Sequence, residues 1–361
     1  MARYGIGIIG TGWGAWIQEP AFRAAGLDVV AIAGRYPAKT LRIADELEIP
    51  YAAHHWRELL ERDDVALISI VTPTNLHCEM AIAALEAGKH VLCEKPIGID
   101  SSEARRMLAA ARAHPAQFAL IDYELRFLPA FQAARQLVAD GAIGRLRHAE
   151  ARLIASSHAN LQRPWNWWDD ASQGGGILCA VSAHQIDILR YVLNDEVAAA
   201  QGFLYTFVAE RTVKETGKPT RMRPVTSDDF AAFHLRFKRG GMAVGSASMV
   251  ARIDEPQSLT LYGDEGTLRF VSGRLLHARP GEELRDITPP HTLEYRITTY
   301  PDYAEATTYL GQALRAALNG DLAAIAPAAT FLDGLRVQRV LDVVRCSSAE
   351  GRGWIAVELE D

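Results

Sequence analysis

The sequence has no long hydrophobic run and no excess of charge of one sign, and both absences restrict its function. In its 361 residues, no apolar stretch approaches the 18 or more residues that a membrane span requires. Thirty-eight Lys and Arg residues are set against 44 Asp and Glu residues, a net charge of -6. Residues 1–123 carry 12 basic and 15 acidic groups, and residues 124–361 carry 26 and 29. Without a basic face, we expect neither a nucleic acid nor a membrane as a partner.

Cysteine is scarce, which limits both disulfide and metal chemistry. The four cysteines are Cys78, Cys93, Cys179 and Cys346, and no two of them form a CxxC pair. Buried thiols in a reducing compartment are the expected state. The sequence has no HxxxH motif and no Cys/His cluster, so we expect no metal site. The first ten residues run into glycines, which does not fit a signal peptide, and we expect a cytoplasmic protein.

Short apolar runs alternate with helical patterns over the first third of the chain. Such runs, largely β-branched or aliphatic, are typical of strands buried on both faces of a parallel sheet. The predicted strands are Tyr4–Ile9, Val29–Ala33, Ala66–Val71, His90–Cys93 and Phe118–Ile121, and the predicted helices are Ala15–Ala25, Lys39–Glu48, Leu76–Ala87 and Ser102–Ala113. This alternation predicts a doubly wound α/β (Rossmann) domain over residues 1–123.

Longer alternating segments follow from about residue 124. The predicted strands are Arg147–Ala155, Ala199–Ala209, Asp229–Phe237, Met242–Ala251, Ser258–Tyr262, Thr267–Phe270 and Ile355–Leu359, and the predicted helices are Pro129–Asp140, Val181–Leu193, Tyr303–Leu318 and Pro327–Cys346. Glycine-containing turns at 238–241 and 263–266 indicate hairpins. We predict an α+β domain over residues 124–361, with a largely antiparallel open sheet and helices on one face. Residues 210–226 look the least ordered.

The first predicted strand leads into a glycine-rich turn that opens the first helix. Gly10 and Gly12 hold the first two positions of the GxGxxG/A fingerprint and Ala15 holds the third, with Trp13 and Gly14 between them. The first glycine allows the tight turn, the second lets a pyrophosphate approach the backbone, and the third position must be small for close packing. N–H groups at the helix start then face the phosphates. The string alone also fits an ordinary turn, but its place at a strand–helix junction favours a dinucleotide site.

The end of the second predicted strand bears on the choice of cofactor. NAD-binding domains carry Asp or Glu there for the ribose 2′-hydroxyl, whereas this strand ends in Gly34 and Arg35. Asp28 has about the right offset but lies at the start of the strand. Because a guanidinium suits a phosphate, Arg35 favours NADP over NAD, and Lys39 is a second candidate cation. The alternative is that Arg35 is an ordinary solvated arginine with no role in cofactor binding.

Further motifs follow in order along almost the whole chain. They are Thr72-Pro73-Thr74-Asn75-Leu76-His77 (TPxxxH), Glu94-Lys95-Pro96 (EKP), Arg126-Phe127-Leu128-Pro129 (RFxP), Gly174-Gly175-Gly176 followed by His184-Gln185-Ile186-Asp187 (HxxD), and the turn Gly263-Asp264-Glu265-Gly266-Thr267. Together they resemble the motifs of the glucose–fructose oxidoreductase/inositol dehydrogenase (Gfo/Idh/MocA) family. The resemblance implies a nicotinamide-dependent oxidoreductase, whose further cofactor-binding residues are Thr72, Pro73, Asn75, His77, Glu94 and Lys95.

The resemblance assigns the central chemical role to Lys95. The family places this lysine at the carboxyl end of a strand, beside the nicotinamide and the substrate hydroxyl, where open α/β sheets bind ligands. The bond before Pro96 is often cis in the family, which would aim Lys95 into the cleft. Hydride transfer leaves the alcohol proton to be removed, and a partly desolvated lysine can accept or return a proton near neutral pH. The alternative is a surface lysine before a turn proline.

His184 is the second candidate for catalysis. The family's usual string is GGGxxxDxxxHxxD, in which Asp and His are neighbours on one helix face. Here Ala180 stands at the aspartate position, so the paired Asp/His device is broken. His184 then works alone with Lys95 or binds a substrate hydroxyl. Asp187, three residues on, orients His184 or is a structural helix residue.

Aromatic residues before the three glycines suit a sugar. Trp165 and Trp168 lie in a loop rich in Trp, Asn and Asp, where aromatic faces take the C–H side of a sugar and polar groups take its hydroxyls. Core packing under a long loop is the alternative. Tyr123 and Arg126 are likewise candidates for substrate binding or for packing.

These features predict an oxidoreductase that prefers NADP and transfers hydride to or from a hydroxyl or keto carbon of a sugar, polyol or similar small molecule. Ala180 keeps open a hydrolase or lyase of the same family, which retains its cofactor and oxidises transiently. A non-catalytic cofactor-binding regulator is the other alternative, against which Lys95 and His184 argue.

The second domain also carries a prediction about assembly. In the family, the open face of this sheet usually pairs with another subunit. Residues 199–209 are apolar on both phases of the strand pattern, as Phe203, Leu204, Phe207 and Val208 illustrate. A sheet with one solvated face would be more polar on its outer side, so we predict a homodimer or homotetramer.

Overall fold

Two compact units make up the part of the chain that the computed structural model describes, namely residues 4–213, 220–290, 292–293 and 300–359. Unit 1 comprises Met1–Gly98, Ser102–Leu128 and His291–Leu335, and unit 2 comprises Ile99–Ser101, Pro129–Pro290 and Arg336–Asp361. Each unit is therefore assembled from segments that are far apart in the sequence.

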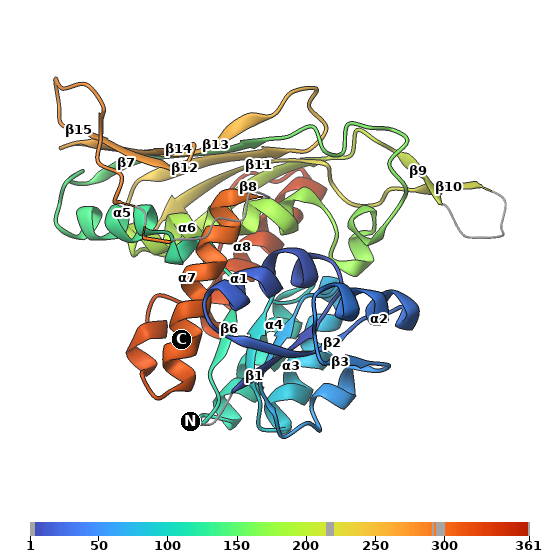
Figure 1. Cartoon of the computed structure of the whole chain (residues 1–361). Coiled ribbons are helices and arrows are strands. Elements are labelled where there is room, and N and C mark those ends of the chain that lie inside the picture. The colour runs from blue at the N-terminus through green and yellow to red at the C-terminus, as the bar shows by residue number, and fades with distance from the viewer. Residues whose placement is uncertain (1–3, 214–219, 291, 294–299, 360–361) are drawn as a thin grey trace. The chain divides into compact units, whose positions relative to one another are not determined.

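Unit 1 is built on a parallel sheet flanked by helices (Figure 1). Its described strands are β1 (Gly5–Ile9), β2 (Asp28–Ala33), β3 (Tyr51–Ala53), β4 (Val65–Ile70), β5 (His90–Cys93), β6 (Ala119–Ile121) and β17 (Ala329–Thr330), in the order β17-β6-β5-β4-β1-β2-β3. Its helices are α1 (Glu19–Ala24), α2 (Pro37–Glu46), α3 (His77–Glu86), α4 (Ser101–Ala113) and α7 (Pro301–Leu318). β1 lies between β2 and β4, so the strand order reverses there. Ligands of such sheets bind at the carboxyl edge of this switch point. The predicted doubly wound fold is confirmed.

Burial explains why the short apolar runs form the central strands. Ile6, Ile8, Ile32, Leu67 and Leu92 are all 0% exposed. Side chains on both faces of these strands are thus removed from water, and each contributes about 1.5–3 kcal/mol. β3 was not predicted, because three residues are too few to show a pattern.

The division of the chain differs from the predicted boundary between residues 123 and 124. All of residues 124–361 were predicted to form the second domain, but α7 and β17 belong to unit 1. β17 pairs antiparallel with β6 at the edge of the sheet. α7 packs so closely on unit 1 that a Cβ at Gly311 would lie 2.8 Å from the Cβ of Ala25. Such long-range packing leaves no periodic signal in the sequence.

Unit 2 holds a largely antiparallel sheet and three α-helices among its described residues (Figure 1). The strands are β7 (Leu146–Ile154), β8 (Val197–Tyr205), β11 (Phe230–Phe237), β12 (Met242–Ser248), β13 (Glu255–Gly263), β14 (Thr267–Val271), β15 (Arg274–Ala278), β16 (Arg285–Asp286) and β18 (Ile355–Ala356), in the order β16-β15-β14-β13-β7-β12-β11-β8-β18. The helices are α5 (Pro129–Ala139), α6 (Ala183–Leu193) and α8 (Phe331–Glu350), whose first turn belongs to unit 1. β7 and β12 pair in parallel, and the other described pairs are antiparallel. The predicted α+β fold is confirmed, although β15 and β16 were not predicted.

The segment predicted to be least ordered, residues 210–226, contains a hairpin. Its strands are β9 (Glu210–Val213) and β10 (Arg221–Pro224), which pair antiparallel. Residues 214–219 between them lie outside the described residues. Arg211 of β9 is 1% exposed, and its guanidinium donates to the carbonyls of His158 and Asn160. The polar composition of this segment therefore serves buried interactions as well as solvation.

One helical stretch in the described residues, Ala171–Leu193, is long and apolar enough to cross a membrane by length and composition. In the apolar window of this stretch, 89% of the residues are buried inside the protein. Such burial is typical of a core helix, so the stretch is a weak indication of a membrane span.

Candidate active site

The glycine-rich turn joins β1 to the first helix of unit 1, as predicted. Gly10 has a φ of +140°, and a Cβ there would lie 2.1 Å from the carbonyl oxygen of Val71, so this position requires glycine. A Cβ at Gly14 would lie 2.7 Å from Ile8, which makes Gly14 a close-packing position. A Cβ at Gly12 would meet nothing within 4 Å. The backbone at Gly12 is open to an approaching group, and this shape fits the pyrophosphate of a dinucleotide.

The helix after this turn begins with a π-helical turn, Gly14–Gln18, that continues into α1. The N–H groups of Ala15 and Trp16 donate to the carbonyl of Gly12 at 3.1 and 3.2 Å. The first N–H groups of a helix otherwise lack intrahelical acceptors, which suits a phosphate. The ring of Trp13 lies 5.4 Å from that of Tyr300, so its side chain packs within the protein.

The end of β2 lies directly against the glycine turn. A Cβ at Gly34 would be 2.6 Å from Cγ2 of Thr11. The next residue, Arg35, is exposed, with its guanidinium carbon 5.5 Å from the ring of Tyr36. Asp28 is at the first position of β2, at the opposite end of the strand. The strand end beside the turn therefore presents a cation and no carboxylate.

His77 holds together the two turns that follow β4 and β5. Its Nδ1 lies 3.0 Å from the carbonyl oxygen of Pro96, and its Nε2 lies 3.0 Å from that of Thr72. Burial lowers the pKa of His77 to about 4, so the ring is neutral near neutral pH. A neutral ring carries one N–H and so donates to only one of these two carbonyls. Both contacts place His77 between the two turns, and its predicted role in cofactor binding stays a prediction. Asn75, in the first of these turns, is exposed.

Lys95 follows β5 at the carboxyl edge of the sheet and is partly exposed. The Lys95–Pro96 peptide bond is cis, as the resemblance implied. The backbone N–H of Lys95 donates to Oε2 of Glu94 at 3.3 Å. Burial raises the pKa of Glu94, Asp122 and Glu124, and the charge of Lys95 acts to lower the pKa of all three. Lys95 therefore stands beside a group of carboxyls.

Two of these carboxyls, Asp122 and Glu124, were missed by the sequence prediction. They flank Tyr123 after β6, the strand next to β5. Asp122 is 0% exposed and Glu124 is 2% exposed. Burial and the neighbouring carboxyls raise the pKa of both residues well above the ordinary range. The signal that could have found them is their position, since acidic residues directly after a buried strand lie at the ligand-binding edge.

His184 and Asp187 both lie on α6, whose residues are all buried. Asp187 Oδ1 lies 3.7 Å from Nη1 of Arg190, which supports the structural interpretation of Asp187. Ala180 lies in a π-helical turn, Leu178–Ser182, directly before α6. One turn of either helix type is close to four residues, so position 180 remains about one turn before His184.

The predicted aromatic loop has protein partners. The guanidinium carbon of Arg223 lies 3.6 Å from the ring centre of Trp165, and the indole N–H donates to the carbonyl of Pro224 at 3.1 Å. The ring of Trp168 meets that of His158 edge-on, with centroids 5.4 Å apart. Trp165 and Trp168 thus both pack against other side chains of the protein, as the packing alternative predicts.

Tyr123 and Arg126, the other candidates for substrate binding, are buried in unit 1. Tyr123 is 2% exposed and Arg126 is 5% exposed. Nη2 of Arg126 lies 3.2 Å from Oδ1 of Asp333, so a carboxylate of the protein compensates its charge. This arrangement favours a structural role for Arg126 over substrate binding.

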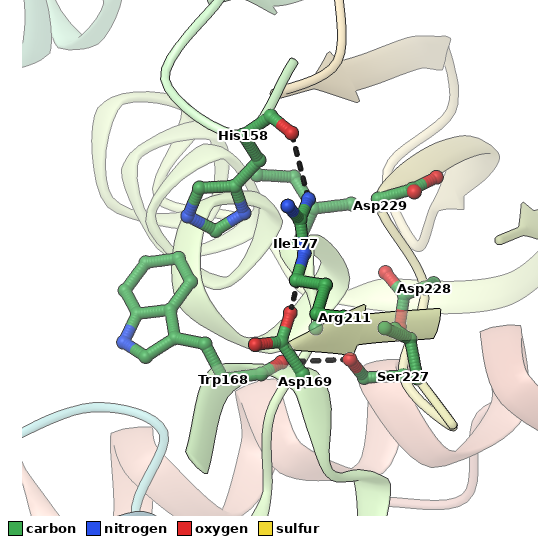
Figure 2. A pocket seen from close by; sticks show the side chains of 10 residues that line it. His158, Trp168, Asp169, Ile177, Arg211, Ser227, Asp228 and Asp229 are labelled. Carbon is green, nitrogen blue, oxygen red and sulfur yellow. Dashed lines mark hydrogen bonds and ion pairs between the residues drawn. The ribbon is translucent and has the colours of Figure 1, made fainter. Parts of the chain in front are cut away.

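Unit 2 contains a small pocket beside the aromatic loop, lined in part by charged side chains (Figure 2). Asp169 lies at its wall and forms ion pairs with Arg163 and, at 3.2 Å, with Nε of Arg211. Asp228 accepts from the N–H of Leu178 at 2.7 Å, and burial raises its pKa to about 6. Within the described residues, no group of three or more His, Cys, Asp or Glu residues could hold a metal ion.

A doubly wound domain with this glycine turn, followed by an α+β domain, defines a class of two-domain dinucleotide-binding enzymes. Comparison with known families is more specific. Residues 4–121 match the oxidoreductase family with NAD-binding Rossmann fold, and residues 131–269 match the GFO/IDH/MocA C-terminal domain. The chain belongs to the Gfo/Idh/MocA oxidoreductase family.

Individual relatives span nearly the whole chain. Glucose-fructose oxidoreductase domain-containing protein 2 of Xenopus laevis is 31% identical, covering 99% of this chain and 95% of that protein. An oxidoreductase domain protein from Kribbella flavida has a structure with a TM-score of 0.85 and 31% identity, covering 99% of this chain and 100% of that one. Levoglucosan dehydrogenase, solved with NADH and levoglucosan, is 25% identical with a TM-score of 0.84, covering 98% and 99% of the two chains.

Proposed function

We propose that the protein is a dehydrogenase or reductase that prefers NADP and acts on a hydroxyl or keto carbon of a sugar, polyol or similar small molecule, with Lys95 as general acid and base. The observation that carries the proposal is the position of Lys95, which follows a strand two places from β1 and its open glycine turn. Both lie at the edge of the sheet where ligands bind.

The residues that would hold the dinucleotide are the glycine turn, the end of β2 and the two turns joined by His77. Gly12 leaves space for the pyrophosphate, and Arg35 offers a guanidinium to a 2′-phosphate. The bound nicotinamide would supply the hydride acceptor or donor. Lys95 would take the hydroxyl proton during oxidation and return a proton during reduction. Glu94 contacts the Lys95 backbone and would hold the turn in place.

The substrate class rests on the relatives and on the aromatic loop. The 25% identical structure of levoglucosan dehydrogenase contains NADH and levoglucosan, an observation about that protein that supports a sugar here. Its NADH also makes NAD the competing cofactor to test. Trp165 and Trp168 keep exposed ring area, since both are only partly buried.

A cofactor turnover assay tests the proposed function. The purified protein is incubated with a panel of sugars and polyols and with NADP or NAD, and the absorbance of the reduced nicotinamide is followed. We expect net reduction with NADP, lost in Lys95→Ala. Product release without net cofactor turnover would instead identify a transient-redox hydrolase or lyase, and bound cofactor without any product would identify a regulator.

We also propose that the protein is a homodimer or homotetramer through the sheet of unit 2. Phe203 and Tyr205 of β8 are 60% and 50% exposed, and Phe207 after the strand is 62% exposed. Met242 and Val244 of β12 are 40% and 44% exposed. An apolar strip of this kind is typical of a subunit contact. Light scattering at micromolar protein should give a multiple of the monomer mass, and Phe203→Glu should lower it.

A further inference from the structure

A buried hydrogen-bonded array lies next to Lys95 in unit 1. Gln18 Nε2 donates to Oδ2 of Asp122 at 2.7 Å and to Oε1 of Glu94 at 3.2 Å. Ser69 Oγ donates to Oε1 of Gln18 at 2.5 Å. Because the Gln18 amide donates through its nitrogen and accepts through its oxygen, these partners fix its orientation. Gln18, Ser69 and Asp122 are each 0% exposed, whereas Glu94, at the Lys95 end of the array, is partly exposed.

Two carboxyls of this array lie close together without a paired cation on Asp122. Glu94 and Asp122 accept from the same Gln18 nitrogen, and Oδ1 of the fully buried Asp122 has no hydrogen-bond donor in the described structure. A proton on one of the two carboxyls would let them hydrogen-bond each other, which two ionised carboxylates cannot do. Burial, then the charge of Glu94, raise the pKa of Asp122 well above its ordinary range. Burial also raises the pKa of Glu94, but the charge and the backbone N–H of Lys95 act to lower it. The balance favours the proton on Asp122 and the charge on Glu94.

We propose that Asp122 is a positioning residue for Lys95, a protonated acid that donates to Glu94 and, with Gln18, holds the Glu94 carboxylate against the Lys95 backbone. The inference rests on the proposed function of Lys95. Sharing one proton leaves Glu94 and Asp122 with a single negative charge. Two charges would favour the ammonium form of a neighbouring lysine and oppose the release of its proton.

The surroundings of Asp122 agree with this assignment. Gln18 comes from the turn that starts the first helix, and Ser69 from β4. Cys93 and Glu94 come from the end of β5, and Glu124 from the turn after β6. These neighbours are polar or acidic, and the cation whose charge reaches Asp122 is Lys95.

Infrared spectroscopy of the unliganded protein tests the protonation state directly. At about pH 8 exposed carboxyls are ionised, so the C=O stretching band of carboxylic acids reports buried acids. Asp122→Asn should remove part of this band, and Asp286→Asn, at an exposed carboxylate whose pKa is about 2, should leave it unchanged. A loss of carboxylate signal in Asp122→Asn, with the acid band intact, would overturn the proposal.

A matched pair of variants tests the positioning role. Asn at position 122 keeps a donor toward Glu94, whereas Leu fills a similar volume without one. We expect Asp122→Leu to lower kcat by about 10–100-fold and to move the pH–rate profile, as a misplaced catalytic group does, while Asp122→Asn stays close to wild type. Equal kcat values in the two variants, with melting temperatures that confirm folding, would refute the role.

The two experiments separate the possible failures. If no sugar or polyol supports turnover, the proposed function fails, while the infrared result still decides the protonation of Asp122. If turnover is present and the acid band does not change in Asp122→Asn, the positioning role fails and the proposed function stands.

Discussion

Two buried acidic sites of this molecule are stabilised in opposite ways. In unit 2, Asp169 is 4% exposed and lies between Arg163 and Arg211. In unit 1, Asp122 is 0% exposed and lies against Glu94 and an uncharged glutamine. A buried carboxylate needs a paired cation, and a carboxyl without one takes up a proton. Asp169 therefore has its charge compensated by paired arginines, whereas the proposal places a proton on Asp122.

The difference indicates what each site is for. Arginine cannot give up its proton, so the Asp169 site joins a loop to β9 and does no proton chemistry. The Asp122 site holds exchangeable protons beside a lysine that follows β5. The first site should thus determine stability, and the second should determine turnover.

The largest expected effect is on turnover and comes from Lys95. Lys95→Ala should lower kcat by about 10²–10⁴, or about 3–5 kcal/mol, because a general acid–base group is lost. Folding and cofactor binding should change little. Steady-state kinetics and thermal melting check both parts, with the exposed Lys238→Ala as a control. Near-wild-type turnover in Lys95→Ala would show that the site around Lys95 and Asp122 does not determine turnover.

The matching change in unit 2 should affect stability. Asp169→Ala leaves Arg163 and Arg211 without their shared carboxylate, and breaking such a buried pair costs about 3–5 kcal/mol. Urea denaturation measures the loss. Asp170→Ala is the control, because its partner Arg223 is 45% exposed and its N-cap bond to Ser172 is worth about 0.5–2 kcal/mol. Equal losses of unfolding free energy in Asp169→Ala and Asp170→Ala would contradict the larger stabilising role expected for Asp169.

His184 should have a smaller effect than Lys95. Without an aspartate at position 180, we expect it to bind a hydroxyl rather than to carry the essential proton. His184→Ala should therefore lower kcat/KM by about 1.5–3 kcal/mol. Ala180→Asp places a carboxylate about one turn before His184, which should shift the pH–rate profile by charge attraction. If His184→Ala is as inactive as Lys95→Ala, this weaker role is wrong.

Arg35 is an exposed cation, unlike the buried Arg211 and the partly buried Arg163 around Asp169. Arg35→Ala should weaken NADP binding by about 1–3 kcal/mol, the scale of a charge-assisted hydrogen bond, and leave NAD binding nearly unchanged. Calorimetric titration of both dinucleotides checks this. Tighter binding of NAD than of NADP by the wild type would contradict the preference.

Asp228 lies in the same unit as Asp169, but burial raises its pKa, as it raises that of Asp122. Its pKa rises by burial from 3.8 to about 6 in the folded state. A raised carboxyl binds more protons in the folded state, so stability falls as the pH rises through this window. Asp228→Asn should flatten that fall, by about 1–2 kcal/mol after allowance for its partial exposure. Urea denaturation at several pH values between 3.8 and about 6 measures how the free energy of unfolding changes with pH. The same pH dependence in wild type and Asp228→Asn would exclude Asp228 as its source.

Most of the fold and the local site motifs could be predicted from the sequence. Apolar runs of period two or of continuous type define the strands, and the GTGWGA turn at residues 10–15 follows a strand in both the prediction and the structure. The EKP turn likewise follows β5. These features are local, because the secondary structure of a short segment follows mainly from the pattern of its own side chains.

The remaining features depend on contacts between distant parts of the chain. Gln18 lies 76 residues from Glu94 and 104 residues from Asp122 in the sequence, yet it donates a hydrogen bond to each. No rule of sequence spacing relates these three positions. The return of α7 and β17 to unit 1 is another such contact. Protonation states depend on burial and on neighbouring charges, which exist only once distant segments have packed together. The sequence could therefore place Lys95 at a sheet edge, but only the fold brings Gln18 and the carboxyls of Glu94 and Asp122 together beside it.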